Sequence, residues 1–372
     1  MNVTDSLRGA RVFVTGHTGF KGSWLLLLLD RLGAKVTGYS LAPPTTLALF
    51  DVARIRDLVD VHHEADIRDA ARLAAAVYEA RPDVVIHLAA QSLVRLSHRE
   101  PLDTFSTNVV GTASVLDAVR HSGRPCVVIC VTSDKCYEPH AAGQPHDEAD
   151  RLGGHDPYSA SKGAAELVAA AYRRSFFPPA GLHEHGIQLA TVRAGNVIGG
   201  GDWAADRIVT DIVRHLTADE PVPVRNPVSV RPWQHVLEPL TGYLSLAAVM
   251  LAAPAAEWCT GWNFGPAADD DITVQQLTEI FINAWGAGCW KDTHDPRAPI
   301  ETHVLRLAIE KSQAALPWRP RFSSREAIQR TAGWFRSFGN DPTAARRLCL
   351  ADIEAYEQRV ATDRLPTPGV NA

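Results

Sequence analysis

RVFVTGHTGFKGSWLLLLLDRLG, residues 11–33, is the stretch that decides the fold of this chain. Residues 11–15 are apolar and rich in β-branched side chains, which predicts a short strand. Glycines then recur at every third position, and residues 23–33 carry a nearly continuous aliphatic run that is typical of a buried helix. The stretch therefore predicts a strand, a glycine turn and a helix in direct succession.

Further apolar segments alternate with helical stretches along the first half of the chain. They are near-continuous hydrophobic runs, which favours parallel strands covered on both faces over half-exposed antiparallel ones. We expect these strands at residues 35–39, 59–63, 83–88, 126–132 and 188–193. The sequence therefore predicts an α/β fold built on a doubly wound parallel sheet, the Rossmann architecture.

After Gly195 the alternation loosens, and segments rich in glycine, proline, tryptophan and arginine appear. These segments are long for mere connections, which favours a ligand-facing lobe. We expect an NAD-binding Rossmann domain over residues 1–195 and a smaller C-terminal α/β substrate-binding lobe over residues 196–372. Some segments at about 230–262 are expected to return to the Rossmann domain.

The composition excludes some classes of partner. The 372 residues carry a formal charge of 37 − 42 = −5, so no basic excess favours nucleic acid or an anionic membrane surface. The longest aliphatic run, Leu25–Leu29, is far shorter than the roughly 20 residues that span a bilayer. Since the N-terminus also lacks a secretory leader pattern, we expect a cytoplasmic protein.

The six cysteines show no CxxC pair. Their scatter fits a reduced cytosolic protein better than a disulfide framework or a structural zinc site. We therefore expect buried thiols, and we expect no bound metal.

Gly16, Gly19 and Gly22 stand in GxxGxxG spacing between the first strand and the first helix. Glycine can serve a tight turn for steric reasons alone, but in this context it lets backbone amides approach a pyrophosphate at the helix N-terminus. The end of the second strand, residues 39–41, lacks the acidic residue that usually holds the adenosine ribose. Because no arginine follows within ten positions to balance a 2′-phosphate, we expect NAD rather than NADP.

Tyr158 and Lys162 form a YxxxK pair on a predicted helix, and a spacing of four places both side chains on one helical face. A phenol with a reference pKa of about 10 is a poor base at neutral pH. A neighbouring ammonium and a bound nicotinamide cation would both favour the phenolate, which could then take a proton from a sugar hydroxyl. The competing interpretation is a surface pair, since YxxxK alone is common by chance.

Ser133, Asp134 and Lys135 follow a predicted strand at the carboxyl edge, where ligands bind in open α/β sheets. A simple oxidoreductase or epimerase needs only a small hydroxyl residue there. An acid beside a base suits an elimination, with Asp134 protonated and Lys135 neutral, and both states require shifted pKa values. The alternative interpretation is an ordinary turn at a strand end.

Several motifs together resemble those of one group of enzymes. They are GHTGFKGSWL, HLAAQSLVRLS, VTSDKCYE, DPYSASK, RAGNVIGGGDWAADR, RPWQHVLEPLTGY and WNFGP, spread between Arg11 and Phe335. They resemble the CDP-glucose 4,6-dehydratases, within the extended short-chain dehydrogenase/reductase family. TSDKCY and GNVIGGGDW are the most specific, because the related dTDP-glucose 4,6-dehydratases carry an acidic residue where Lys135 stands. The resemblance implies tightly bound NAD and conversion of CDP-glucose to CDP-4-keto-6-deoxyglucose.

The resemblance also implies roles for individual residues. The implied catalytic residues are Ser133, Asp134, Lys135, Tyr158 and Lys162. The implied cofactor residues are Gly16, Thr18, Gly19, Phe20, Lys21, Gly22, Asp66, Ile67, Leu88, Ala89, Ala90, Tyr158 and Lys162. The implied substrate residues are Gln91, Asn196, Arg207 and Arg231, and the arginine fork suits a diphosphate. For Asp66 a helix N-cap is an equal alternative, and for the two arginines surface solvation is one.

Two positions depart from the pattern, because Ser92 and His98 stand where proline and tyrosine are expected. The hexose is therefore less firmly implied than the reaction class. A nucleotide-sugar C4 epimerase, a dehydratase acting on another nucleotide hexose, and a non-catalytic NAD(H)-sensing protein are the competing readings of the same fold. By analogy with relatives that pack helices into a four-helix bundle, we expect a homodimer or homotetramer.

Overall fold

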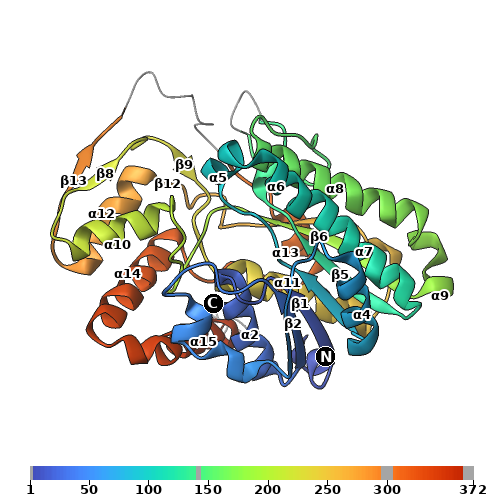
Figure 1. The fold of residues 1–372 in the computed structure, drawn as a ribbon. Coiled ribbons are helices and arrows are strands. Elements are labelled where there is room, and N and C mark those ends of the chain that lie inside the picture. Colours follow the sequence, from blue (N-terminus) through green and yellow to red (C-terminus); the bar gives the residue numbers. More distant parts are fainter. Residues whose placement is uncertain (1–2, 140–143, 295–304, 363–372) are drawn as a thin grey trace, which may run out of the picture.

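The computed structural model describes residues 3–139, 144–294 and 305–362 (Figure 1). Its centre is a seven-stranded, all-parallel sheet in the order β11-β6-β5-β4-β1-β2-β3. The strands are β1 (Arg11–Thr15), β2 (Lys35–Ser40), β3 (Val61–Glu64), β4 (Val84–His87), β5 (Cys126–Val131), β6 (Ile187–Ala194) and β11 (Gly261–Phe264). From β1 the chain adds strands toward one edge of the sheet (β2 and β3), and it then crosses back to add β4, β5 and β6 on the other side of β1. This change in strand order falls between β1 and β4, and the crevice at their carboxyl ends is the usual ligand site of such sheets. The prediction of a doubly wound parallel sheet is confirmed.

The edge strand β11 was not among the six predicted strands. Of those six, the prediction is least accurate at β3, which begins at Val61 rather than at residue 59. Val59 ends a 3-10 helix, η1 (Ile55–Leu58), and its amide donates to the Arg56 carbonyl oxygen. The next residue, Asp60, is bound to β2, because its carboxylate accepts a hydrogen bond from the Val36 amide at 2.7 Å. A local turn therefore takes the first two residues of the predicted strand.

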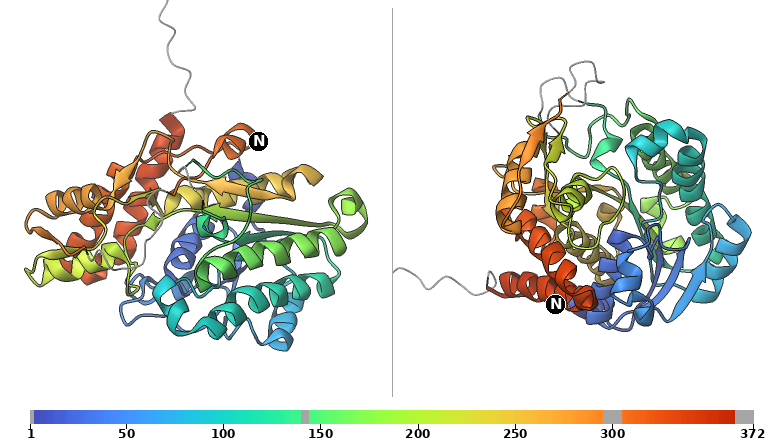
Figure 2. Two further views of the ribbon diagram at one scale, coloured as in Figure 1. Left: turned by 90° about the horizontal axis from the view of Figure 1, so that it is seen from above. Right: turned by 60° about the vertical axis from the view of Figure 1, so that its left-hand side comes forward.

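Helices cover both faces of the sheet (Figures 1 and 2). One face carries α4 (Ala70–Ala80), α7 (Gly111–Ser122) and α8 (Pro157–Ser175), and the other carries α2 (Phe20–Leu32) and α11 (Leu237–Ala252). Alternate strand residues supply the two cores, since Val12 and Val14 lie in one cluster and Phe13 in the other. This alternation buries the strands on both sides, as their apolar sequences predict.

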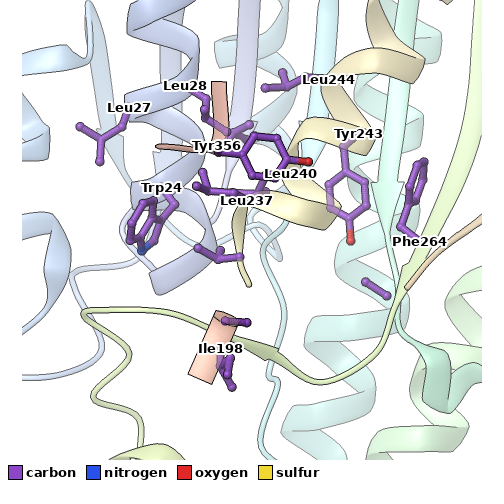
Figure 3. Close-up of a cluster of buried hydrophobic side chains, with 14 of the residues drawn as sticks. Trp24, Leu27, Leu28, Ile198, Leu237, Leu240, Tyr243, Leu244, Phe264 and Tyr356 are labelled. Carbon is purple, nitrogen blue, oxygen red and sulfur yellow. The ribbon is translucent and has the colours of Figure 1, made fainter. Parts of the chain in front are cut away.

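Helix α2 is apolar all round and is accordingly buried. Residues 24–29 are each at most 7% exposed, and they pack against α11, where Leu237 and Leu240 lie (Figure 3). The helix ends at Gly33, whose φ of 71° is the left-handed conformation that glycine adopts freely. Within the described ranges, no helix has both the length and the apolar character needed to cross a membrane.

A second lobe stands beside the carboxyl edge of the sheet (Figure 1). Its helices are α10 (Ile208–Thr217), α12 (Val274–Trp285) and α14 (Ser324–Asn340). Its strand pairs are β8 (Val222–Val224) with β13 (Trp290–Asp292), and β9 (Val230–Arg231) with β12 (Ile272–Thr273). One apolar cluster runs from α2 into this lobe, so the core does not divide at residue 195. The domain boundary after residue 195, and the assignment of residues 230–262 to the Rossmann domain, stay predictions.

The remaining elements are short connections and the C-terminal helix. They are α1 (Val3–Leu7), α3 (Leu49–Val52), α5 (Val94–Arg99), α6 (Pro101–Phe105), η2 (Ser106–Val110), η3 (Asp134–Cys136), η4 (Pro179–Gly181), α9 (Leu182–His185), β7 (Val197–Ile198), β10 (Gln234–His235), η5 (Ala256–Trp258), α13 (Glu310–Ala315), η6 (Pro342–Ala344) and α15 (Ala345–Thr362). The six cysteines are free, and five are buried, but Cys289 is exposed. The expectation of a buried thiol is wrong for Cys289, which lies in the short connection between α12 and β13.

Candidate active site

The glycine turn packs too closely for side chains at two of its three glycines. A Cβ at Gly16, where φ is +74°, would lie 2.6 Å from the Ala89 nitrogen. A Cβ at Gly22 would lie 2.3 Å from the Gly16 carbonyl oxygen. Gly19 is the N-cap of α2. The turn, the start of α2 and the segment after β4 therefore form one tight cradle, which fits a dinucleotide pyrophosphate.

Gly16→Ala is expected to weaken NAD binding at least tenfold, because the added methyl would push the turn away from Ala89 and because alanine resists a positive φ. Titration with NAD, followed by protein fluorescence, measures the change. Gly123→Ala is the matched control, since it has a φ of +61° but its Cβ would meet nothing within 4 Å. Equal NAD affinity in the two variants would contradict the cradle.

The other residues implied for NAD lie around this cradle in different ways. Phe20, Lys21, Leu88, Ala89 and Ala90 are half-buried at the start of α2 and just after β4. Burial lowers the pKa of Lys21 to about 8, and the nearby charge of Arg207 adds to this effect. Lys21 thus lies between the glycine turn and one of the arginines implied for substrate.

The Thr18 hydroxyl ties the turn to the end of β2. It lies 2.8 Å from the Ser40 hydroxyl oxygen and donates to the Leu41 carbonyl oxygen at 2.9 Å. At the neighbouring strand, Asp66 is paired with the Arg68 guanidinium at 2.5 Å. Thr18 therefore ties the glycine turn to the end of β2, where no acidic residue stands, and its role in holding NAD stays a prediction.

Asp66 does not cap a helix. Helix α4 is capped by Asp69, whose carboxylate accepts from the Arg72 amide at 3.1 Å, so the N-cap interpretation of Asp66 is wrong. Ile67 is 4% exposed, and it closes against Gly111, where a Cβ would lie 2.4 Å from the Ile67 Cδ1. A role of this pair at adenine stays a prediction.

Tyr158 and Lys162 are both buried, at 8% and 5% exposure, in the first two turns of α8. Asp156 caps this helix by accepting from the Ser159 amide at 3.0 Å, and Pro157 takes the first helical position. The Lys162 Nζ donates to the Val131 carbonyl oxygen at 3.5 Å, and burial lowers its pKa to about 8. The surface-pair interpretation is therefore wrong.

Burial raises the pKa of Tyr158, and two groups act against it. A hydrogen bond with the Ser133 side chain lowers this pKa, and so does the positive charge of Arg207. The sequence analysis assigned the lowering to Lys162, but among the protein's own groups Ser133 and Arg207 exert it. The residue just before Asp134 is thereby linked directly to the phenol.

Ser133, Asp134 and Lys135 lie where β5 ends and η3 begins. The Ser133 hydroxyl donates to Asp134 Oδ1 at 3.0 Å and accepts from the Lys135 amide at 3.2 Å. Asp134 is 3% exposed, and its Oδ2 has no hydrogen-bond partner within the described part of the chain. Burial raises the pKa of Asp134, against the opposing charge of Lys135, which is itself only half-buried. Burial thus shifts the pKa of this carboxyl group upward, in the direction that a proton donor requires.

A buried ion pair anchors residues 132–137, the segment that carries Asp134 and Lys135. Glu166 pairs with Arg193 at 2.8 Å, and its Oε1 accepts from the Thr132 hydroxyl at 2.6 Å. Arg193 Nη1 donates to the Tyr137 hydroxyl oxygen at 2.6 Å, and that hydroxyl donates to Asn263 Oδ1 at 2.7 Å. Both ends of residues 132–137 are therefore anchored to buried charges. The sequence analysis missed this pair, although Glu166 lies one helical turn beyond Lys162.

Asn108 is a second residue that the sequence analysis missed. It lies in the π-helical turn η2, and its Nδ2 donates to the Ser161 hydroxyl oxygen at 2.8 Å. The Ser161 hydroxyl in turn donates to the Tyr158 carbonyl oxygen at 2.7 Å. Asn108 therefore braces the first turn of α8, where the phenol is carried. The π-helical turn that places it has no simple sequence signal.

The hydrogen bonds of Gln91 are made with residues near it in the segment after β4. Its Nε2 donates to the Thr104 hydroxyl oxygen at 2.8 Å and to the Leu93 carbonyl oxygen at 3.1 Å, and its backbone amide donates to Asn108 Oδ1 at 2.8 Å. Both amide hydrogens are thus used internally. The structure places Gln91 as a support of the loop after β4, and its contact with substrate stays a prediction.

The remaining residues implied for substrate lie at the open side of the site. Arg207 is exposed, and its Nη2 donates to the Ser92 carbonyl oxygen at 3.2 Å. Arg231 is half-buried, and its charge lowers the pKa of Asp134. Asn196 is half-buried, with its carbonyl oxygen accepting from the Gln234 amide at 3.0 Å. His98 is exposed on α5. Across the described residues, no group of three His, Cys, Asp or Glu side chains is placed to hold a metal ion.

Comparison with known proteins identifies the class. The model of the NAD dependent epimerase/dehydratase family matches residues 12–253, and the chain belongs to this family. It is similar to the CDP-glucose 4,6-dehydratase of Salmonella typhimurium, with 47% identity over 354 residues that span 95% of this chain and 98% of that protein. The resemblance drawn from the motifs and the expectation of NAD are confirmed.

Two further relatives are more distant. The dTDP-glucose 4,6-dehydratase of Streptomyces antibioticus is 32% identical over 73% of this chain and 75% of its own length. The solved dTDP-glucose 4,6-dehydratase of Streptomyces venezuelae, with NAD and TYD bound, is 26% identical, with a TM-score of 0.72 over 90% of this chain and 99% of that chain. The similarity in sequence and in fold thus extends over nearly the whole chain.

Proposed function

We propose that this enzyme converts CDP-glucose to CDP-4-keto-6-deoxyglucose by removing one water from the hexose. The observation that carries this proposal is the buried Asp134 carboxyl, with one oxygen unpartnered among the described residues, next to Lys135 and joined through Ser133 to Tyr158. An epimerase has no use for this acid and base. The similarity to the Salmonella enzyme supports the same reaction and the same substrate.

NAD would lie on the glycine cradle of Gly16, Gly19 and Gly22, with Lys21 and the segment after β4 beside it. When bound, NAD accepts hydride during oxidation at C4 of the sugar and gives it back at C6. The helix N-terminus of α2 stabilises the negative charge of the pyrophosphate.

Tyr158 takes the proton of the C4 hydroxyl as that carbon is oxidised. Ser133 and Arg207 oppose the rise in pKa that burial imposes on the phenol, and Ser133 can pass its hydrogen bond to the sugar oxygen. Lys162 shares the helical face of Tyr158, and its Nζ is held at the Val131 carbonyl oxygen, where it can bind the cofactor. Together these groups form a base at the carboxyl end of β5.

The C4 ketone then acidifies the proton on C5. Lys135 removes this proton, and Asp134 gives its own proton to the departing C6 hydroxyl, which leaves as water. Burial of Asp134 suits this role, because a desolvated carboxyl group retains its proton at higher pH. Lys135 then gives its proton back to C5 as C6 is reduced, so that atoms and charge balance over the whole reaction.

The diphosphate of the substrate would meet Arg207 and Arg231, with Asn196 alongside. The two guanidinium groups come from the second lobe, on the segments that lead into α10 and form β9. Arginine binds phosphate oxygens two at a time. The lobe therefore supplies positive charge on the open side of a site whose reacting groups come from the sheet.

The reaction is tested by incubating the purified enzyme, supplied with NAD, separately with CDP-glucose and dTDP-glucose. The alkaline absorbance of a keto sugar and the product mass are followed. We expect a product that lacks one water from CDP-glucose, formed much faster than from dTDP-glucose. A product of unchanged mass would contradict dehydration, and faster turnover of dTDP-glucose would contradict the choice of nucleotide.

We also infer a cytoplasmic enzyme that forms a homodimer or homotetramer through its α6–α8 side. Large apolar side chains are exposed there, with Leu102 at 84%, Val110 at 56% and Leu167 at 60%. Helix α6, the π-helical turn η2 and helix α7 follow one another without a break and lie beside α8 on the outside of the molecule (Figure 1). Burying such a surface against a second copy would remove it from water.

Leu167→Arg is expected to convert the oligomer to monomers, because it would bury an unpaired charge in the interface. Light scattering after gel filtration measures the mass. Tyr78→Arg on α4, where the side chain is 63% exposed, is the control and should leave the oligomer intact. An unchanged mass for Leu167→Arg, or a monomeric wild type, would contradict this interface.

A further inference from the structure

Tyr243 presents a buried hydroxyl that the proposed reaction leaves without a role. The residue lies on α11, is 0% exposed, and its Oη has no hydrogen-bond partner in residues 3–139, 144–294 or 305–362. A buried hydroxyl without a partner loses its hydrogen bonds to water and gains none in return, which destabilises the fold. A phenylalanine would fill the same space without this cost, so the hydroxyl calls for a partner in the working enzyme.

The ring fixes the direction of this hydroxyl. It packs edge-on against Phe264 of β11, with ring centroids 5.4 Å apart. Figure 3 shows the hydroxyl at the end of the ring farther from Leu244, and in this view Ile198 lies below it. Ile198 belongs to β7, just beyond the carboxyl end of β6. The carboxyl end of β6 lies beside that of its parallel neighbour β5, and η3 begins at this same edge of the sheet.

Asp134 offers the matching atom. Its Oδ2 is likewise buried and unpartnered among the residues described, while its Oδ1 already accepts from Ser133. Helix α11 packs on β5, the strand that ends just before Ser133. The two groups also influence each other electrostatically, because the charge of Asp134 raises the pKa of Tyr243 beyond the effect of burial, and that of Tyr158 adds to it.

We propose that the Tyr243 hydroxyl donates a hydrogen bond to Asp134 Oδ2 across one bridging water molecule, and so positions the acid. This inference rests on the proposed function only for the role of Asp134, not for the contact itself. Tyr243 touches neither sugar nor cofactor in this proposal. It acts through Asp134, holding the carboxyl group in place and stabilising the carboxylate that remains once the proton has gone to the leaving hydroxyl.

Removing the Tyr243 hydroxyl is expected to raise the pKa of Asp134. A hydroxyl that donates to a carboxylate favours the ionised form, so its loss raises the carboxyl pKa. The other groups that act on Asp134 stay in place in such a variant, and they are Lys135 and Ser133 on η3, Arg231 on β9, Lys21 on α2 and Tyr158 on α8. A change in titration after removal of the Tyr243 hydroxyl is therefore attributable to that hydroxyl.

The test compares wild type with Tyr243→Phe, each with NAD bound. We expect kcat for CDP-glucose to fall about tenfold at an unchanged KM, and the high-pH limb of the kcat profile to move up by about one unit. Tyr356→Phe is the matched control, since it also removes a buried hydroxyl, one that donates at 3.0 Å to Glu238 in the first turn of α11 and not to Asp134. It should lower thermal stability without moving the pH profile.

A second readout does not depend on turnover. Carbon-13 labelling of the aspartate carboxyls, with Asp134→Asn used for assignment, gives the titration of Asp134 in both proteins. We expect a higher pKa in Tyr243→Phe, and an identical titration would overturn the proposed contact. Wild type that fails to form a keto sugar would overturn the proposed function instead, so the two failures are distinct.

Discussion

Tyr158→Phe is expected to lower kcat about 10³-fold, equivalent to about 4 kcal/mol of lost transition-state stabilisation. The phenol is the base for the first step, and Phe leaves no group at that position to take the proton of the C4 hydroxyl. Lys162 cannot replace it, because its Nζ is directed to the Val131 carbonyl oxygen. The ring would keep its packing, so the fold and NAD affinity should persist.

The measurement is a steady-state assay with CDP-glucose, together with NAD titration of the same preparation. Tyr78→Phe on the exposed side of α4 is the control and should match wild type. A Tyr158→Phe protein that retains more than a tenth of wild-type kcat would contradict the assignment of the base.

Lys135→Ala is expected to separate oxidation from elimination. The base for the C5 proton would be lost, while Tyr158, Ser133 and the glycine cradle would remain intact. Turnover should fall at least about 10²-fold. In a single turnover, absorbance of the reduced cofactor should rise and persist, because the keto sugar cannot lose water.

Lys291→Ala is the control for this variant, because Lys291 is an exposed lysine on β13, in the second lobe. It should show wild-type turnover and no lasting absorbance. If Lys135→Ala lost NAD binding to the same degree as turnover, or formed the keto sugar at the wild-type rate, Lys135 would not be the base.

The sequence predicts well those features of the molecule that depend on residues close together in the chain. The strand at residues 11–15, the glycine turn and the spacing of Tyr158 and Lys162 depend on neighbours within a few positions. Even so, β3 was misplaced by two residues, because a 3-10 turn ending at Val59 competes with the strand. Local apolar content alone does not show which of the two forms.

The supports of the site could not be predicted, because their partners are far apart in sequence. Glu166 on helix α8 pairs with Arg193 on strand β6, and Asn108 in the π-helical turn η2 donates to Ser161 on α8. Gln91 was assigned to substrate from its motif, but its amide group is used inside its own loop. Tyr243 stood within a quoted motif, yet its relation to Asp134 requires the packing of α11 on β5.

The most direct test of water removal uses CDP-glucose that carries deuterium at C4. The product is analysed by mass and by proton NMR. The account predicts a product that has lost one water and carries the deuterium on C6, because hydride leaves C4 and returns at C6 within one turnover. A product that keeps its C6 hydroxyl, with the deuterium back on C4, would contradict it.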